Sequence, residues 1–391
     1  MRGMGGTSWR VAGLPGPCLL VERAGRESTG RSRRFGAGPL DHMQGPTRSP
    51  YAMRARSAIG LLIGLLCSFA SAASDRLAVV VPARGAQQLA VVGADGAGRV
   101  LLTSGPGRNQ APAWSPDGRS IAYAHSRGAA SVIRIVSADG KRDRTLTPSS
   151  ESATLPAWSP DGKRIAYVQT GEHGGRIAIV EVDGGNRRVL TAGDDTAPVW
   201  SPDGRHLAFV ARRDGTPRLH VMRADGSGER RVSLAEEIVL LRPGVLHPAW
   251  SPDGRRIAYV VRVARAEQRI SIVDVDGGGH RRFGTGYAPA WSPDGKRLAF
   301  VVARVGDAQL YVADADGAQP RPLTRGGINL LPSWSPDGKR IAFVASREGD
   351  LAVWVMNADG TGERRVAQVA GDLSTLPVLA WRPISRSARP P

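Results

Sequence analysis

The sequence predicts an all-β protein, a single β-propeller built from four-stranded antiparallel blades. The pentapeptide Trp-Ser-Pro-Asp-Gly occurs six times, and a degraded seventh copy, Trp-Arg-Pro, follows. Successive copies are separated by 41 to 50 residues, close to the ~40–45 residues of a propeller blade. This single period favours one closed array over several domains in the 391 residues. The tryptophans that mark the repeats are Trp114, Trp158, Trp200, Trp250, Trp291, Trp334 and Trp381.

Each pentapeptide has the composition of a tight turn between the first two strands of a blade. Ser, Pro and Gly fall where a type I turn favours a capping hydroxyl, a fixed φ and a permissive residue. The following segment, for example Ile165-Ala166-Tyr167-Val168, is apolar at both alternating positions, so neighbouring sheets must cover both of its faces. We therefore interpret the repeat tryptophans as core packing between blades and the turn aspartates as structural. These aspartates are Asp117, Asp161, Asp203, Asp253, Asp294 and Asp337.

A second turn signal, Asp-Gly, follows the third strand of every repeat, as at Asp139-Gly140. The segment Asp274-Val275-Asp276-Gly277 has the first ligands of a calcium loop, but the later ligands and the closing Glu are absent. We interpret these segments as hairpin turns.

The two ends of the repeat region complement each other. The first repeat lacks a first strand, because residues 77–81 match a second strand, whereas residues 378–383 match a first strand that no others follow. We expect the C-terminal strand to complete the N-terminal blade and close the ring. This predicts seven blades over residues 73–384, or six if one set is merged near the insertion at 235–245. Residues 385–391 are expected to be a disordered tail.

The segment before the repeats is expected to lie outside the fold. Residues 1–52 are rich in Gly, Arg, Pro and Ser without apolar periodicity, so we interpret them as a non-native or disordered extension. Residues 53–72 match a signal peptide, with a basic start, an apolar stretch over 59–69 and the small residues Ala70-Ser71-Ala72. We expect translation to begin at Met53 and cleavage near Ala72-Ala73. The protein is then periplasmic or secreted, with no stable membrane span after cleavage.

Charge and composition restrict the classes of partner. The formal net charge is +18, and the first 72 residues hold ten Arg and three acids, which leaves +11 for the remainder. Arginine pairs such as Arg187-Arg188 recur at one place in the repeat, which indicates a solvated outer strand. The alternative is a basic rim for an anionic envelope component or an acidic partner. A nucleic-acid partner is not predicted, because the few aromatic residues are assigned to the core.

Motifs of catalysis are not found in the sequence. Both cysteines, Cys18 and Cys67, precede the repeats, and the seven histidines fall at different places in different repeats. There is no Gly-x-Ser-x-Gly elbow and no phosphate-binding glycine-rich loop before a helix. The sequence therefore predicts a protein that is not an enzyme and has no cofactor or metal.

Candidate binding residues are found where the repeats differ. The residue four positions before each tryptophan varies, and if the first strands line the central channel, these side chains gather at one mouth of it. The alternative is that they only begin the first strands. The candidates are Gln110, Thr154, Thr196, Leu246, Tyr287 and Leu330, with His247 beside Leu246 and Pro377 in the imperfect last copy. We interpret His247 as a loop residue rather than a metal ligand.

The repeat Pro-x-Trp-Ser-Pro-Asp-Gly-Lys/Arg-x-Ile/Leu-Ala-Phe/Tyr-Val resembles the propeller repeat of the TolB family, most completely at residues 332–344. The resemblance covers about residues 75–383. It implies a periplasmic protein that binds the peptidoglycan-associated lipoprotein or a similar envelope protein. We expect a monomer. The chain departs from that family in its seven expected blades instead of six, and in having no counterpart expected for the separate N-terminal α/β domain. Similar repeats form the propellers of prolyl-oligopeptidase-type peptidases, whose hydrolase domain has no counterpart expected here either.

The leading hypothesis is an exported, non-catalytic propeller that binds an envelope protein or peptide at the channel mouth. The alternative is a propeller enzyme or binding protein that acts on a carbohydrate or other small molecule in the central channel. Convergent carboxylates or histidines at one level of the channel would favour this alternative. A third possibility is a scaffold without a dedicated ligand.

Overall fold

The computed structural model describes most of the repeat region. The described residues are 75–83, 85–172, 174–234, 248–262, 267–347, 349–369 and 379–384. All of them belong to one compact unit. They form the strands β1 to β28, and these described ranges contain no helix. The predicted signal peptide, the N-terminal extension and the C-terminal tail lie outside the described residues.

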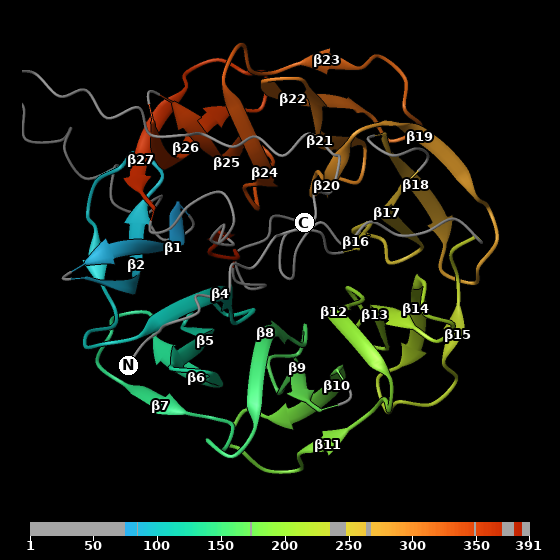
Figure 1. Cartoon of the computed structure of the whole chain (residues 1–391). Coiled ribbons are helices and arrows are strands. Elements are labelled where there is room, and N and C mark those ends of the chain that lie inside the picture. The colour runs from blue at the N-terminus through green and yellow to red at the C-terminus, as the bar shows by residue number, and fades with distance from the viewer. Residues whose placement is uncertain are drawn as a thin grey trace, which may run out of the picture. The chain divides into compact units, whose positions relative to one another are not determined.

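Each blade is a four-stranded antiparallel sheet, as predicted. In one of them, β4 (Arg108–Trp114), β5 (Ser120–Arg127), β6 (Ala130–Ser137) and β7 (Asp143–Thr145) pair in sequence order. The first strand of each blade ends at the repeat tryptophan and lies toward the centre, and the fourth lies on the outside (Figure 1). The four strands of a blade are therefore ordered from the channel to the rim.

The same pattern recurs along the chain. The next two blades contain β8 (Ser152–Trp158), β9 (Arg164–Gly171), β10 (Gly174–Glu181) and β11 (Arg188–Val189), then β12 (Asp194–Trp200), β13 (His206–Arg212), β14 (Pro217–Arg223) and β15 (Arg230–Arg231). They are followed by β16 (Ala249–Trp250), β17 (Arg256–Arg262), β18 (Gln268–Asp274) and β19 (Arg281–Thr285). The last two complete sets are β20 (Tyr287–Trp291), β21 (Arg297–Arg304), β22 (Asp307–Asp314) and β23 (Arg321–Pro322), then β24 (Ile328–Trp334), β25 (Arg340–Arg347), β26 (Asp350–Asn357) and β27 (Arg364–Gln368).

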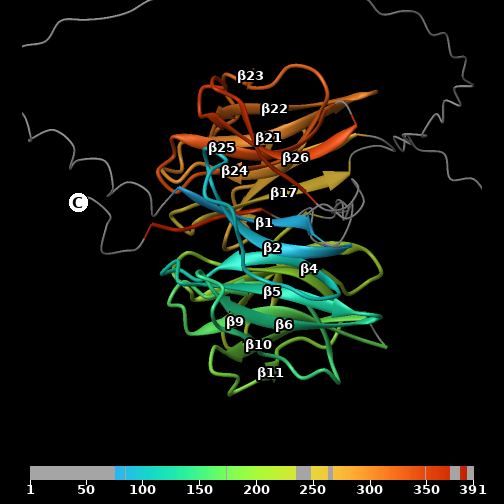
Figure 2. The same cartoon turned by 90° about the vertical axis from the view of Figure 1, so that its left-hand side faces the viewer.

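The last strand of the chain joins the sheet of the first three strands by pairing with β1. β1 (Arg76–Ala83), β2 (Ala86–Gly93) and β3 (Val100–Leu101) are joined by β28 (Ala380–Trp381), in which Trp381 lies opposite Leu77 of β1. Figure 2 shows β1 and β2 between the blade of β24–β27 and the blade of β4–β7. The pairing of β28 with β1 is the one expected for a closing strand. The blade count and the closure of the whole ring stay predictions.

Two blades are linked to their predecessors by parallel bridges that the sequence did not predict. β2 pairs with β4 at Gln87 and Arg108, and β22 pairs with β24 at Ala308 and Ile328, so these sheets extend to eight strands. At the second bridge, the buried Asn329 side chain donates to the backbone carbonyl of Ala308 over 3.2 Å. This buried amide needs hydrogen-bond partners, and its bond to Ala308 holds the blade of β24–β27 against the preceding blade.

The Trp-Ser-Pro-Asp-Gly segments are tight turns with a shared hydrogen-bond network. The Gly118 amide donates to the Ser115 carbonyl over 2.8 Å, and Gly118 has a φ of 66°, which glycine adopts without strain. The Ser115 hydroxyl donates to Asp117 Oδ1 over 2.6 Å, and this carboxylate accepts the Arg119 amide over 3.0 Å. Ser and Asp therefore satisfy the backbone and each other in one turn, which explains why both recur.

The strand after each turn is buried on both faces, as its composition predicts. Ile121 and Ala122 are fully buried and Tyr123 is 1% exposed. The hydrophobic clusters lie between successive blades, and Ile121 packs with Trp114 and with Leu89 of the preceding blade. The core is thus a series of layers between sheets.

The repeat tryptophans link each blade to the one before it. Each indole Nε1 donates to a backbone carbonyl on the first strand of the preceding blade, as Trp158 does to Ala113 over 3.0 Å. The series continues from Trp200, Trp250, Trp291, Trp334 and Trp381 to Ala157, Val199, Ala249, Ala290 and Ser333. Trp114 in turn donates to Ala380 of β28 over 3.1 Å. The seven repeat tryptophans therefore form a continuous series in which the last strand is bonded to the first complete blade.

Arginine side chains cover most of these indoles. The guanidinium of the residue six positions after one tryptophan lies over the indole of the next blade. These pairs are Arg164 with Trp200, Arg256 with Trp291, Arg297 with Trp334 and Arg340 with Trp381, at 4.8 to 5.5 Å. Arg382 lies over Trp114 at 5.7 Å. Two blades have Ser120 and His206 at this position instead of arginine. The indoles of the blades that follow them, Trp158 and Trp250, are more exposed than the other five, which are only 7–8% exposed.

We expect Ser120→Arg to stabilise the protein. The new guanidinium would lie over Trp158, as its counterparts lie over their indoles, and should add ~0.5–1 kcal/mol to the free energy of unfolding. Urea denaturation followed by tryptophan fluorescence measures the change. Ser120→Gln is the control, because glutamine is long but uncharged. An equal gain from glutamine would show that covering the ring, rather than the cation–π contact, is responsible.

Part of the basic outer strand holds the blades together. Arg144 and Arg230 donate to the backbone carbonyls of Val182 and Val275 in the following blades. Arg321 donates to the carbonyl of Asp359 over 3.0 Å. These guanidinium groups bind at the Asp-Gly turns, so the outer-strand arginines are not all freely solvated.

Candidate functional site

The first strands carry a recurrent irregularity at the level of the candidate residues. A β-bulge follows Gln110, Thr154, Thr196, Tyr287 and Leu330. The next residue in each strand has a positive φ although it is not glycine, for example 51° at Leu155 and 56° at Ala197. Proline then follows and cannot donate to the ladder, which explains the break. Bulges re-aim side chains, and strained backbone of this kind clusters at binding sites.

The structure brings two of the sequence candidates together. Thr154 and Thr196, from the first strands of adjacent blades, line one pocket. Gln110 is exposed, whereas Tyr287 and Leu330 are partly buried and pack against hydrophobic clusters between blades. Burial raises the pKa of the Tyr287 hydroxyl to about 12. The remaining candidates, Leu246, His247 and Pro377, lie outside the described residues.

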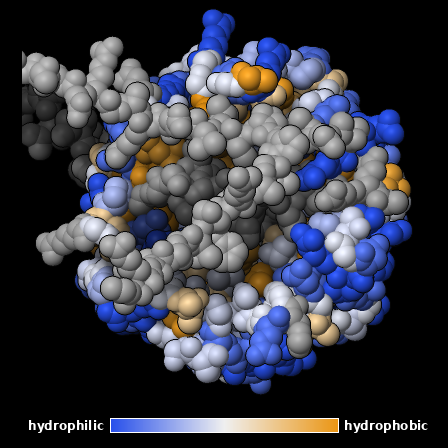
Figure 3. Space-filling view, viewed as in Figure 1, coloured by the Kyte–Doolittle hydropathy of each residue, from blue (hydrophilic) through white to orange (hydrophobic). Residues whose placement is uncertain are grey.

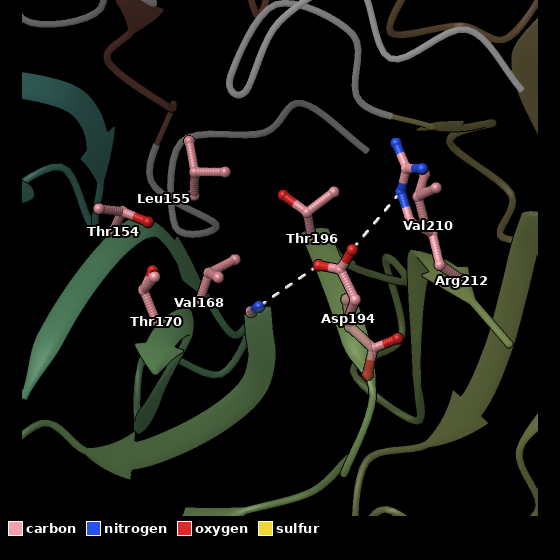
Figure 4. A pocket seen from close by; sticks show the side chains of 10 residues that line it. Thr154, Leu155, Val168, Thr170, Asp194, Thr196, Val210 and Arg212 are labelled. Atoms are coloured by element: carbon pink, nitrogen blue, oxygen red, sulfur yellow. Dashed lines mark hydrogen bonds and ion pairs between the residues drawn. The ribbon is translucent and has the colours of Figure 1, made fainter. Parts of the chain in front are cut away.

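The pocket lies between the blades of β8–β11 and β12–β15 and has a volume of about 350 Å³. Figure 4 shows the Thr154 and Thr196 side chains on neighbouring strands. The other side chains that line the pocket include Leu155, Val168, Thr170, Asp194, Val210 and Arg212. It therefore combines three hydroxyls with three aliphatic side chains and an ion pair.

The charged groups of the pocket are open to solvent. Asp194 accepts the Gly175 amide over 3.4 Å, and its other carboxylate oxygen lies 3.5 Å from Arg212 Nε (Figure 4). The Asp194 and Arg212 side chains are 54% and 41% exposed. An exposed ion pair at this distance contributes ~0–1 kcal/mol to stability. Asp194 and Arg212 can therefore separate to bind a ligand at little cost.

An ion network around the buried Asp195 supports the pocket from one side. Asp195 lines the pocket with a fully buried side chain, and Arg213 holds it through Nη1–Oδ1 and Nη2–Oδ2 contacts of 2.6 and 3.3 Å. Arg213 also donates to Glu229 over 2.8 Å, and Glu229 lies 2.9 Å from Nδ1 of His220. Burial lowers the pKa of His220; Glu229 opposes this shift and Arg213 adds to it. The network fixes the start of β12, from which Asp194 and Thr196 project.

Sequence reasoning missed these charged residues. It looked for a ring of convergent carboxylates or histidines at one level of the channel, but the adjacent carboxylates Asp194 and Asp195 belong to a single blade. The available signals were the pairs Asp194-Asp195 and Arg212-Arg213, which depart from the other repeats at both ends of one hairpin. Among the described residues, no group of three or more His, Cys, Asp or Glu is placed to hold a metal ion.

The described residues around the outside of the face shown in Figure 3 are largely hydrophilic.

The sequence matches the family model of the TolB β-propeller domain over residues 129–240 and 235–382. The chain belongs to this family. The propeller fold, its four-stranded blades and the resemblance found in the repeats are thereby confirmed. No curated protein matches the sequence. In the part of the chain that the structure describes, no helix is long and apolar enough to cross a membrane.

Solved structures of TolB-like and enzymatic propellers are similar to this chain. TolB from Acinetobacter baumannii is 20% identical, with a TM-score of 0.52 over 76% of this chain and 79% of that one. Oligogalacturonate lyase from Vibrio parahaemolyticus is 15% identical, with a TM-score of 0.56 over 69% and 83%. A puromycin-hydrolysing peptidase from Mycobacterium tuberculosis is 18% identical, with a TM-score of 0.58 over 76% of this chain and 54% of that one. At these identities the similarity establishes the fold alone.

Proposed function

We propose that this chain is an exported, non-catalytic propeller that binds a protein or peptide segment of the cell envelope at the channel mouth. One observation carries the proposal. Thr154 and Thr196, which the repeat pattern marks as variable, come from adjacent blades into one pocket beside the Asp194–Arg212 pair. A first candidate partner, implied by the family, is a protein like the peptidoglycan-associated lipoprotein.

The chemistry of the pocket suits a peptide. Threonine hydroxyls can donate to and accept from backbone amides, and Leu155, Val168 and Val210 can contact an aliphatic side chain. The carboxylate of Asp194 and the guanidinium of Arg212 provide one group of each sign for a charged side chain or terminus. A small set of placed polar groups over an apolar wall is typical of specific binding sites.

Substitution of both threonines tests this proposal. We expect Thr154→Ala/Thr196→Ala to weaken partner binding about tenfold, because two lost hydrogen bonds are worth ~0.5–1.5 kcal/mol each. The measurement is capture from envelope extract after mild cross-linking, with residues 73–391 as bait, followed by titration of the purified partner. Ser227→Ala/Thr361→Ala, on exposed hydroxyl residues next to two Asp-Gly turns, is the control. A partner retained equally by all three baits would contradict the proposal.

A small anionic carbohydrate is the second candidate ligand. The similarity to the fold of an oligogalacturonate lyase favours it, together with hydroxyls and the Arg212 guanidinium in one pocket. Thermal unfolding in the presence of oligogalacturonides distinguishes the two candidates. A saturable rise in the melting temperature that is lost in Arg212→Gln would favour a sugar acid over a peptide as the ligand.

A further inference from the structure

A second pocket, of about 200 Å³, lies at the blade of β4–β7 and shares no lining residue with the pocket of Thr154 and Thr196. The side chains of Ser104, Asn109, His125, Arg127, Arg134 and Asp143 are among those that line it. Neither the family repeat nor the proposed function accounts for this set. His125 is the only histidine at its place in the described repeats, where other blades have Gln169, Ala211, Val261, Val302 and Ala345.

The hydrogen bonds around Asn109 determine the tautomer of His125. Nδ2 of Asn109 donates to Thr103 Oγ1 over 2.9 Å and to Gln88 Oε1 over 3.2 Å, and Thr103 donates its own proton to Gln88 over 2.7 Å. Asn109 Oδ1 is therefore the atom that faces His125 Nδ1, at 2.7 Å. An acceptor at Nδ1 places the proton of the neutral imidazole there and leaves Nε2 with a free lone pair.

Other blades show what usually surrounds the arginine of this pocket. Thirteen residues after the repeat tryptophan, Arg213 and Arg347 each bind a carboxylate on the outer part of the same blade, Glu229 and Glu363, both over 2.8 Å. Arg347 also donates to the Asn329 side-chain oxygen over 3.3 Å.

Arg127 occupies the same position in the blade of β4–β7 but has neither partner. His125 takes the Asn109 oxygen, while Asp143 is bonded to the Tyr123 hydroxyl and to Arg134 Nε over 2.8 and 3.1 Å. Among the residues that the structure describes, Arg127 makes no ion pair, and its side chain is exposed at the pocket. The residue that is paired in two other blades is available here for an external anion.

We propose that the pocket of His125, Arg127 and Arg134 binds a small oxyanion, a phosphate group. Arg127 supplies the charge that the group needs, and Arg134 adds to the positive field although Asp143 holds it in place. His125 Nε2 accepts a hydrogen bond from a hydroxyl group of the ligand, so the pocket recognises an oxyanion that still carries one acidic hydrogen. The Ser104 hydroxyl lies at the same opening and can donate to a further oxygen.

The electrostatics of His125 support this arrangement. Burial lowers its pKa, Arg134 and Arg127 lower it further, and Asp143 opposes them. Tyr123, the other titratable group here, has its pKa raised chiefly by burial and next by Asp143, so it stays protonated. A bound anion offsets the two arginines and raises the pKa of His125. Anion binding and proton uptake by His125 therefore favour each other.

Nuclear magnetic resonance of the histidine ring signals in the full protein tests the proposal, with inorganic phosphate as the probe and His125→Gln used to assign the signal. We expect a saturable shift of the His125 signal, and binding about tenfold weaker or more in Arg127→Gln because a charged hydrogen bond is lost. Arg304→Gln is the matched control. Arg304 stands at the equivalent position, is exposed, and has Val302 in place of the histidine.

A second anion separates the proposed chemistry from simple charge attraction. Sulfate has no proton to offer near neutral pH, so it should bind only as His125 becomes protonated, whereas phosphate should bind above that pH as well. Glycerol phosphate, used in parallel, shows whether the pocket takes an ester or only the free ion. An unchanged His125 signal with every anion, or equal weakening by Arg304→Gln and Arg127→Gln, would overturn the proposal.

Discussion

Trp381→Ala should lower the free energy of unfolding by ~3–5 kcal/mol, the usual cost of removing a buried tryptophan from a packed core. Trp381 is 7% exposed and packs in one cluster with Leu77 and Val353, which lie on strands from opposite ends of the repeat region. The substitution also removes the indole hydrogen bond to Ser333 and the contact with Arg340. Because β28 contains only two residues, Trp381 is one of the few side chains that anchor it to its neighbours.

The same substitution tests ring closure. Trp291→Ala is the matched control, since Trp291 is 8% exposed, donates to Ala249 over 3.1 Å and has Arg256 over its ring. Urea denaturation should show a similar loss for both variants. Hydrogen exchange should differ, because only Trp381→Ala releases β28 and should accelerate exchange in β1. Exchange in β1 that is equal in both variants would mean that β28 does not close the ring.

The repeat pattern predicted the architecture because its residues act locally. Ser, Asp and Gly of the pentapeptide satisfy one another within a single turn, and the apolar run that follows, such as 165–168, requires cover on both faces wherever it occurs. The pairing of β1 with β28 was also predictable from two incomplete repeats. Such features depend on spacing and composition, which a sequence displays directly.

The candidate sites were predicted less completely because they depend on which different residues meet. Thr154 and Thr196 were found through their place in the repeat, but Asp195 and Arg213, eighteen residues apart, became partners only in the folded hairpin. The arginines over the indoles were missed for a similar reason, since each one covers the tryptophan of the next blade. Contacts between repeats are not visible within any one repeat.

Substitution of Arg213 should reveal the largest electrostatic cost in the described fold. Arg213→Met leaves Asp195 fully buried without its cation, and an uncompensated buried charge of this kind costs ~3–5 kcal/mol. Methionine preserves much of the length of the side chain, so the loss is not one of packing alone. Urea denaturation at neutral pH measures the change.

The chain contains its own control for this effect. Arg347 has the same place in its blade and a similar carboxylate partner, Glu363, but it faces the neutral Asn329 in place of Asp195. Arg347→Met should therefore cost clearly less than Arg213→Met. Asp195→Asn copies the neutral arrangement, and when it is combined with Arg213→Met it should restore much of the lost stability, because no charge is then left buried. If the double variant is as unstable as Arg213→Met alone, the cost arises from the contacts of Arg213 with Glu229 and its surroundings, and Asp195 is not the group that makes the arginine necessary.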